Sequence, residues 1–228
     1  MVPHKIVVLS GAGMSAPSGL ATFRDSGGLW HNHRIEDVAT FEAWRRQPEI
    51  VLEFYNQRRA QACAASPNSG HLAIASLEKH FEVVVITQNV DDLHERAGST
   101  KIIHLHGELT KARSTVDPRL IYHIGASPIR IGDHCSRGSQ LRPHIVWFGE
   151  SVPLIDEAAR HVQEAEKLLV VGTSLSVYPA AGLVDFADEL SERVLVDMEP
   201  DGDHDGFRIL VGSADILVTE VAKDWLVK

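Results

Sequence analysis

Residues 6–16 read Ile-Val-Val-Leu-Ser-Gly-Ala-Gly-Met-Ser-Ala, an apolar run that ends in two closely spaced glycines. A short apolar run of this kind is typical of a strand that is buried on both faces of a sheet. The segment from Gly11 to Ala16 fits the dinucleotide-binding fingerprint, with alanine at its third small position. We expect the glycines to let backbone amides approach a pyrophosphate, although a tight strand-to-helix turn would need the same residues.

Similar apolar runs recur along the chain, with stretches of helical pattern between them. Near-continuous apolar strands separated by helices predict a doubly wound, Rossmann-like α/β fold, in which a parallel sheet is covered on both faces. The runs that we assign to strands are residues 6–9, 83–87, 102–105, 145–148, 168–172, 194–196 and 216–218.

Two long segments interrupt this pattern and predict a small inserted lobe. Residues 41–64 have a helical pattern with a break at Pro48, whereas residues 111–142 are rich in Gly, Pro, Ser, His and Arg without a clear period. We expect the second segment to be irregular and poorly packed. The predicted organisation is one domain over residues 1–228, with a core of about 1–35, 80–110 and 144–228 and a small lobe of about 36–79 and 111–143.

The composition limits the classes of protein to which the chain can belong. Its 228 residues, 44% of them hydrophobic, are enough for one compact core with a small lobe. A net charge of −9 predicts no binding to nucleic acid or to an anionic membrane, although a basic peptide would be attracted. Cys63 and Cys135 are too few for a disulfide framework, and we find no signal-peptide or membrane-spanning pattern, so we expect a cytoplasmic protein.

Polar side chains follow two of the predicted strands. Gln88, Asn89 and Asp91 come directly after the second strand, at the carboxyl edge where open α/β sheets bind ligands. Helix capping by Asn89 or Asp91 explains one of these residues but not the set. His104 and His106 share a face of the next strand by its period of two, and a histidine there suits general-base catalysis because its pKa lies near working pH. Taken alone, either histidine would more often be structural.

A glycine-containing stretch, residues 19–30, follows the fingerprint and favours a mobile loop. Phe23 and Arg24 are candidates for a lid over a bound cofactor, and Trp30 adds an aromatic surface for an apolar ligand face. The alternative is that the aromatic side chains fix a long loop to the core.

Together these motifs closely resemble those of the sirtuins, over nearly the whole chain. The resemblance implies an NAD-dependent protein-lysine deacylase. In the family reaction the acyl-lysine oxygen attacks the ribose carbon that bears nicotinamide, a histidine activates a ribose hydroxyl, and nicotinamide and O-acyl-ADP-ribose are released. The motifs are Gly11-Ala12-Gly13-Met14-Ser15, Thr22-Phe23-Arg24-Asp25, Thr87-Gln88-Asn89-Val90-Asp91, His104-Leu105-His106-Gly107, Val146-Trp147-Phe148-Gly149-Glu150 and Gly172-Thr173-Ser174.

The resemblance also implies roles for individual residues. His106 would be the catalytic base, with Asn89 beside it, and Val146, Phe148 and Gly149 would bind the acylated lysine side chain of a protein substrate. The residues that would bind NAD are Gly11, Ala12, Gly13, Ser15, Phe23, Arg24, Trp30, Gln88, Asn89, Val90, Asp91, Gly172, Thr173, Ser174, Asp197, Met198, Glu199 and Ala214.

Tyr55 and Arg58 lie three positions apart in a helical stretch, so they share a face of the helix. They resemble the tyrosine and arginine pair of the sirtuin branch that acts on succinyl- and malonyl-lysine, in which the guanidinium binds the acyl carboxylate. We predict activity on acetyl and on acidic acyl groups. A core-facing tyrosine beside a solvated arginine is the structural alternative.

Two departures from the family pattern change these expectations. Asp197 stands where the family commonly has asparagine, and its charge would repel a 2′-phosphate, so we predict NAD rather than NADP. Most sirtuins hold a structural zinc ion on four cysteines, but here Ser114 stands near the first pair and only Cys135 is left of the second. A structural zinc is therefore doubtful and we assign no metal ligands, although His123, His134 and Cys135 leave a mixed set open.

Three other classes of protein use similar motifs. An NAD glycohydrolase or ADP-ribosyltransferase would use the same pocket, but Tyr55 and Arg58 favour the deacylase. A non-catalytic NAD sensor would not need His106 and Asn89. A hydride-transfer enzyme fits poorly, because the acidic residue expected about 20 positions after the fingerprint is not evident. The sequence specifies neither the protein substrates nor an oligomeric state.

Overall fold

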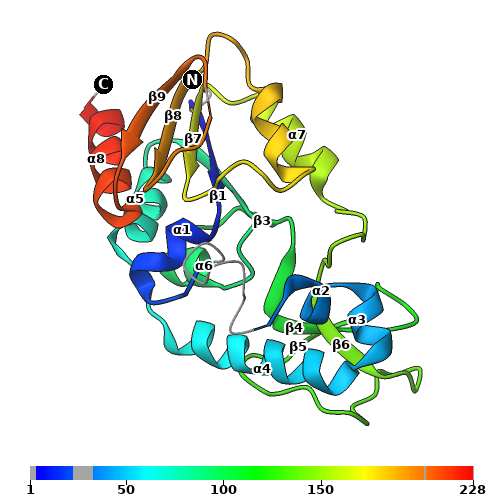
Figure 1. Cartoon of the computed structure of the whole chain (residues 1–228). Coiled ribbons are helices and arrows are strands. Elements are labelled where there is room, and N and C mark those ends of the chain that lie inside the picture. Colours follow the sequence, from blue (N-terminus) through cyan, green and yellow to red (C-terminus); the bar gives the residue numbers. More distant parts are fainter. Residues whose placement is uncertain (1–3, 23–32, 203, 228) are drawn as a thin grey trace.

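A computed structural model describes residues 4–22, 33–202 and 204–227, which form a large parallel sheet and a small antiparallel sheet surrounded by helices (Figure 1). The strand order of the large sheet is β3-β2-β1-β7-β8-β9. The order reverses between β1 and β7, so the fold is the predicted doubly wound one, with its topological switch point there. The strands are β1 (Lys5–Ser10), β2 (Glu82–Thr87), β3 (Ile102–His104), β7 (Lys167–Val171), β8 (Glu192–Asp197) and β9 (Phe207–Val211).

Helices cover both faces of the large sheet, which is why the interior positions of its central strands are apolar on both faces. Side chains of alternate residues, such as Val8, pack on one face against α5 (Ser69–Leu77) and α8 (Ala214–Val227). The opposite face packs against α7 (Ile155–Gln163) and the 3-10 helix η3 (Ala180–Phe186). No helix in the described part of the chain is both long enough and apolar enough to cross a membrane.

The small lobe combines helices with an antiparallel sheet of order β5-β4-β6 (Figure 1). Pro48 occupies the first turn of its long helix, so the predicted break at this residue is confirmed as the junction of two helices. Trp44, Phe54 and Trp147 are among the buried residues of a separate apolar cluster. The elements are α2 (Ile35–Val38), α3 (Phe41–Arg46), α4 (Pro48–Ala64), β4 (Gly107–Ser114), β5 (Ile121–His123) and β6 (Leu141–Ile145).

Two predictions at the carboxyl-terminal end of the chain are wrong. Residues 216–218 lie in α8 and not in a strand, because Ala214, Val218, Val221 and Trp225 are buried at helical spacing. The last strand is instead β9, which is half-exposed at the sheet edge and lacks the continuous apolar run of a central strand.

Three predictions about the small lobe and its borders also need correction. Residues 111–142 are less irregular than expected, because they include parts of all three antiparallel strands, with Ala112 fully buried, whereas the chain between these strands runs through turns and loops as predicted. Residues 145–148 do not form a strand of the parallel sheet, since Ile145 ends β6 and pairs with Gly107 of β4. Helix α5, which we assigned to the small lobe, packs with its Ile74 in the core on the parallel sheet.

Candidate active site

A cavity of about 1000 Å³ lies at the carboxyl edge of the parallel sheet and reaches the small lobe. Every predicted site residue that the structure describes lines this cavity, whereas Phe23, Arg24 and Trp30 lie outside the described residues. The predicted residues brought together are Gly11, Ala12, Gly13, Ser15, Tyr55, Arg58, Gln88, Asn89, Val90, Asp91, His106, Val146, Phe148, Gly149, Gly172, Thr173, Ser174, Asp197, Met198, Glu199 and Ala214.

The glycines of the fingerprint allow two loops to meet at the floor of the cavity. A Cβ at Gly11 would lie 2.6 Å from the carbonyl oxygen of Gly172, and a Cβ at Gly13 would lie 2.6 Å from the Gly172 Cα. The Gly11 and Gly13 amides donate to the carbonyls of Val171 and Gly172, both at 2.9 Å. These two amides are therefore used within the protein, and the approach of other backbone amides of this loop to a pyrophosphate stays a prediction. The glycines permit close packing of the loops after β1 and β7.

The loop after β2 is fixed by the short helix α1 (Ala12–Ser15) that follows β1. The Asn89 side-chain amide donates to the Gly11 carbonyl and to the Ser15 hydroxyl, both at 3.0 Å. Ser15 in turn donates to the Asp91 carboxylate at 3.0 Å. Burial raises the pKa of Asp91, and hydrogen bonds from Leu93 and Ser15 oppose that shift. The strand ends thus bring an amide and a carboxylate to one wall of the cavity.

His106 lies in the turn between β3 and β4, half-buried, and faces the cavity. Its Nδ1 lies 3.1 Å from the carbonyl oxygen of Gln88, and because a carbonyl can only accept, Nδ1 carries the proton. Nε2 is then the basic nitrogen of the neutral ring. Burial lowers the pKa of His106, and the bond to Gln88 opposes this only in part. The ring is therefore neutral at physiological pH, as a general base must be.

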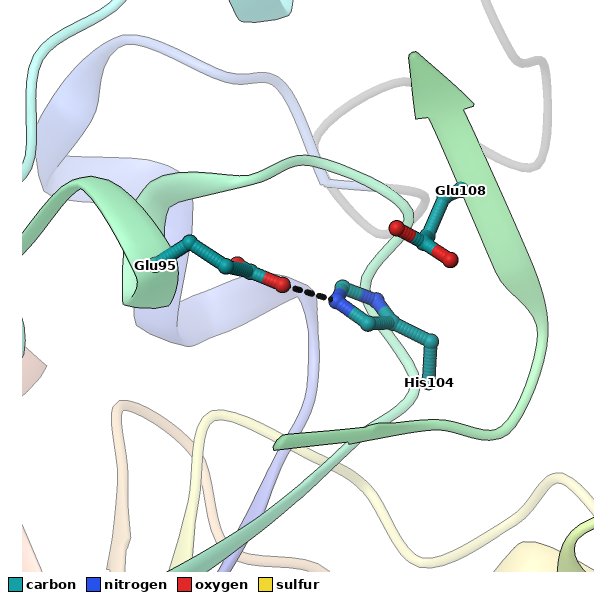
Figure 2. Close-up of side chains that lie close together, drawn as sticks. All are labelled: Glu95, His104 and Glu108. Atoms are coloured by element: carbon teal, nitrogen blue, oxygen red, sulfur yellow. Dashed lines mark hydrogen bonds and ion pairs between the residues drawn. The ribbon is translucent and has the colours of Figure 1, made fainter. Parts of the chain in front are cut away.

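The other predicted histidine, His104, does not line the cavity. We expected both histidines on one strand face, but β3 ends at His104 and the chain turns before His106. His104 Nε2 lies 2.6 Å from Glu95 Oε1, with Glu108 nearby (Figure 2). Burial would lower the pKa of His104, but its hydrogen bond to Glu95 and the charges of Glu95 and Glu108 raise it.

Tyr55 and Arg58 of α4 line the end of the cavity formed by the small lobe. Tyr55 is buried, and its hydroxyl oxygen accepts a 3.0 Å hydrogen bond from Trp147 Nε1. Burial raises the pKa of Tyr55 to about 12, so the phenol is neutral. Burial also lowers the pKa of Arg58 to about 10, which still leaves a cation at neutral pH. This end of the cavity therefore has a phenol and a positive charge in apolar surroundings.

A partly buried ionic network of Arg113, Arg142 and Glu150 holds the chain around Trp147, beside this end of the cavity. The Arg142 guanidinium donates to both carboxylate oxygens of Glu150, at 2.7 and 3.0 Å, and Arg113 donates to the same carboxylate. Glu150 also accepts the backbone amide of Trp147 at 2.9 Å. Arg142 stacks on the Trp147 ring, with 3.3 Å from its central carbon to the ring centroid. The network fixes the wall next to Tyr55.

The opposite end of the cavity is acidic. Asp197 at the end of β8 and Glu199 beyond it line this end, and the Glu199 amide donates to Asp197 Oδ1 at 3.0 Å. Ser213, between β9 and α8, and Asp215, in the first turn of α8, also line it and were missed from the sequence. They were missed because β9 was not predicted, so no sheet edge was expected beside Ala214.

The small lobe does not provide a zinc site. The Ser114 hydroxyl accepts the Asp117 amide at 3.2 Å and lies 2.9 Å from the hydroxyl of Ser139, which is 3.1 Å from Cys135 Sγ. The Asp117 carboxylate accepts hydrogen bonds from Arg119. Among the described residues, no group of three potential ligands includes Cys135, and the donors here do not fit a zinc ion.

Comparisons with known proteins agree with this geometry. Residues 11–179 match the model of the Sir2 family. The chain is 52% identical over 204 residues to an NAD-dependent protein deacylase of Bacteroides thetaiotaomicron, covering 87% of each chain. It is similar to a Sir2 homologue solved with NAD, with a TM-score of 0.84, 37% identity and coverage of 97% and 89%.

A Sir2 structure with a p53 peptide and NAD⁺ has a TM-score of 0.80, 29% identity and coverage of 99% of this chain and 95% of that one. The family match spans most of the chain, and the relative is identical at about half of the aligned positions. The chain therefore belongs to the Sir2 family.

Proposed function

We propose that the protein is an NAD-dependent protein-lysine deacylase that releases nicotinamide and O-acyl-ADP-ribose. The placement of His106 carries this proposal. A neutral imidazole with Nε2 as its basic nitrogen shares one cavity with the fingerprint loop and with Val146 to Gly149. The relative from Bacteroides thetaiotaomicron, named as an NAD-dependent protein deacylase, supports the same activity.

The cavity suits NAD in size and in its polar groups. Its volume of about 1000 Å³ is at the upper end for small-molecule sites, as an extended dinucleotide with a lysine side chain requires. We assign the phosphates to the loop of Thr173 and Ser174, and the nicotinamide carboxamide to Asn89 and Asp91. The Asp91 carboxylate can accept a hydrogen bond from the nicotinamide carboxamide. The side-chain amide of Asn89 donates to Gly11 and Ser15, and these two bonds fix its orientation.

When bound, NAD supplies the ribose carbon that accepts the acyl oxygen of the substrate. We assign the proton of the ribose hydroxyl to His106 Nε2, because the bond from Nδ1 to Gln88 fixes the ring orientation and the tautomer. The apolar wall that includes Val146 and Phe148 would receive the acyl-lysine and exclude bulk water.

We also propose that acidic acyl groups, succinyl and malonyl, are accepted along with acetyl. A guanidinium binds a carboxylate in a fork, and Arg58 lies at the cavity end where an acyl chain would point. Tyr55 remains a neutral donor because burial raises its pKa to about 12. The proposed partners are acylated lysines of other proteins. We also propose a cytoplasmic location, which the free thiols of both cysteines support, because disulfides are rare in a reducing compartment.

The activity is tested by incubating matched acetyl-lysine and succinyl-lysine peptides with NAD and following both by mass spectrometry. We expect loss of the acyl group from each peptide, dependent on NAD and abolished in His106→Ala. Nicotinamide release without any change in the peptide would instead indicate a glycohydrolase or an ADP-ribosyltransferase.

Acyl selectivity is tested with Arg58→Met, a variant of similar length without the charge. We expect desuccinylation to fall by at least tenfold more than deacetylation, because only the succinyl group has a carboxylate for the guanidinium. Equal losses on the two peptides would contradict a role of Arg58 in acyl recognition.

A further inference from the structure

His104 and His106 bind two consecutive carbonyl groups of the loop after β2. The ladder between β2 and β3 ends with the pair Thr87 and His104. Beyond that pair, His106 Nδ1 lies 3.1 Å from the Gln88 oxygen and His104 Nδ1 lies 3.2 Å from the Asn89 oxygen. Two imidazole rings therefore connect the segments between the last strand pair and the next backbone hydrogen bond, from the Leu109 amide to the Val90 carbonyl at 2.8 Å.

The hydrogen bond from His104 is one of four that hold Asn89 in place. The Asn89 amide donates to Thr87 Oγ1 at 3.0 Å, and its side chain donates to Gly11 and Ser15. The remaining backbone group, the carbonyl, accepts from His104. Because His104 does not line the cavity, it acts on the reaction only through the residues that it holds.

His104 needs both of its ring protons to make its two contacts. The Asn89 carbonyl can only accept, so Nδ1 is protonated. Nε2 faces Glu95 Oε1 at 2.6 Å, and an ionised carboxylate also only accepts, so Nε2 is protonated as well. The neighbouring Glu108 is paired with Lys111, with 2.6 Å between the carboxylate and the ammonium (Figure 2 shows Glu95, His104 and Glu108).

We propose that His104, as an imidazolium paired with Glu95, is a positioning residue that fixes the loop Gln88–Asn89 for catalysis. This inference rests on the proposed deacylase function. A neutral ring has one N–H and can keep only one of its two partners. It keeps the charged one, Glu95, because hydrogen bonds to ions are the stronger. Loss of the ring's second proton therefore releases the Asn89 carbonyl.

The inference predicts that activity falls at alkaline pH. The groups that act on His104 are His94 and Glu95 from α6 (Leu93–Ala97), Asp91 from the loop before this helix, and Glu108 from β4, which is paired with Lys111. The carboxylates outweigh burial and keep the ring charged above its ordinary pKa. Activity should fall as the pH rises through this raised pKa, whereas His106 limits activity only on the acid side.

Two amide variants separate the contacts of the ring. In His104→Asn the side-chain amide takes the place of Nδ1 and can still donate to Asn89, whereas in His104→Gln it takes the place of Nε2 and can reach only Glu95. We expect His104→Asn to keep kcat within about threefold and His104→Gln to lose on the order of ten- to a hundredfold, because misplaced catalytic groups cost up to that much.

The pH profile distinguishes positioning from a merely structural role. The alkaline limb of kcat should disappear in His104→Asn, since an amide does not titrate, and should move to lower pH in Glu95→Gln, since the carboxylate no longer supports the imidazolium. The melting temperature of each variant identifies any loss of folding, and His80→Asn, at an exposed position after α5, is the matched control.

Three results would overturn the inference. One is a kcat of His104→Gln equal to that of the wild type. Another is an alkaline limb of the pH profile that is unchanged in His104→Asn. The third is inhibition of the wild type by EDTA with recovery on adding Zn²⁺, which would assign Glu95, His104 and Glu108 to a metal ion instead. Absence of NAD-dependent deacylation in the wild type would contradict the proposed function itself, and is thus distinguishable.

Discussion

At the scale of single residues, Trp147 connects the predicted lysine-binding segment with the acyl end of the cavity. Its backbone amide donates to Glu150, and its indole N–H donates to the Tyr55 hydroxyl. Because the Tyr55 oxygen accepts from the indole, its own proton is left to donate to a ligand. The indole therefore sets the direction in which Tyr55 can bind an acyl carboxylate beside Arg58.

Replacing Trp147 by Phe keeps an aromatic ring and removes the donor to Tyr55. We expect KM for a succinyl peptide to rise about tenfold, corresponding to about 1.4 kcal/mol, with little change for the acetyl peptide. Steady-state kinetics on both peptides measure the effect. Trp44→Phe is the matched control, because Trp44 packs in the same apolar cluster. Equal changes in KM for both peptides would contradict the prediction.

Asp197 at the end of β8 gives a second prediction at this scale. Its carboxylate and that of Glu199 line the end of the cavity that we assign to the adenosine ribose, and they would repel a 2′-phosphate. Asp197→Asn keeps an oxygen that can accept from the Glu199 amide. We expect this variant to raise kcat/KM for NADP and to leave NAD little changed. Equal turnover of NAD and NADP by the wild type would show that Asp197 does not select the cofactor.

At the scale of elements, the small lobe replaces metal ligation by hydrogen bonds and packing. Ser139 bridges Ser114 on β4 and Cys135 in the loop before β6. The loop after β4 is further held by the Asp117 carboxylate, which pairs with Arg119 and Arg137. Ile129 and Ala112 are buried against α4 in the cluster of the lobe. Packing and these bonds hold residues 107–145 together.

Chelation should therefore leave the small lobe intact. We expect EDTA to change neither the melting temperature nor the rate of deacylation. Ser139→Ala should destabilise the protein by about 1 kcal/mol, because it removes a bridging hydroxyl, whereas Ser127→Ala at an exposed site of the same lobe should have no effect. Urea unfolding measures both variants. A fall in melting temperature on chelation would indicate a structural metal.

At the scale of the whole molecule, several buried histidines are neutral in the folded state. His71 and His94 pack against each other with ring centroids 4.8 Å apart, beneath the loops that line the cavity. Burial lowers the pKa of His71 to about 4, and it lowers the pKa of His94 well below its ordinary value. Burial likewise lowers the pKa of His144 in the small lobe to about 4. Folding thus opposes protonation in both parts of the molecule.

These histidines predict acid lability. Between pH 6.5, the ordinary pKa of a histidine, and about pH 4, the unfolded chain binds protons that the folded protein does not, so stability falls as the pH falls. The pKa of His104 is raised, so its protonation favours the folded state as the pH falls. The three histidines with a lowered pKa outnumber it. We expect the melting temperature to drop between pH 7.5 and pH 5.

His71→Asn should reduce this dependence on pH, since the amide can accept from Asn68 in place of Nδ1 and does not titrate. The exposed variant His80→Asn should retain the wild-type dependence, which scanning calorimetry at several pH values would measure. A slope in His71→Asn equal to that of the wild type would contradict the assignment.

The sequence determined the central part of the sheet and most of the site. The strands that include Val7, Val84 and Val170 have consecutive apolar residues in their interior because helices cover both faces, and this pattern is local in the chain. The polar residues that follow these strands meet at one edge because parallel strands all end there. These residues, together with the resemblance of their motifs to the sirtuins, were enough to predict a site that contains His106.

Features without a local pattern in the sequence were decided only by the tertiary structure. Strand β9 is half-exposed at the sheet edge and has an apolar run of only Ile209 to Val211, and the apolar residues 216–218 belong to a helix whose buried face became evident only against α5. The separate surroundings of His104 and His106 depend on where the chain turns after β3. The bonds to Gln88 and Asn89 join residues 15 or more positions apart, and no short-range periodicity specifies such contacts.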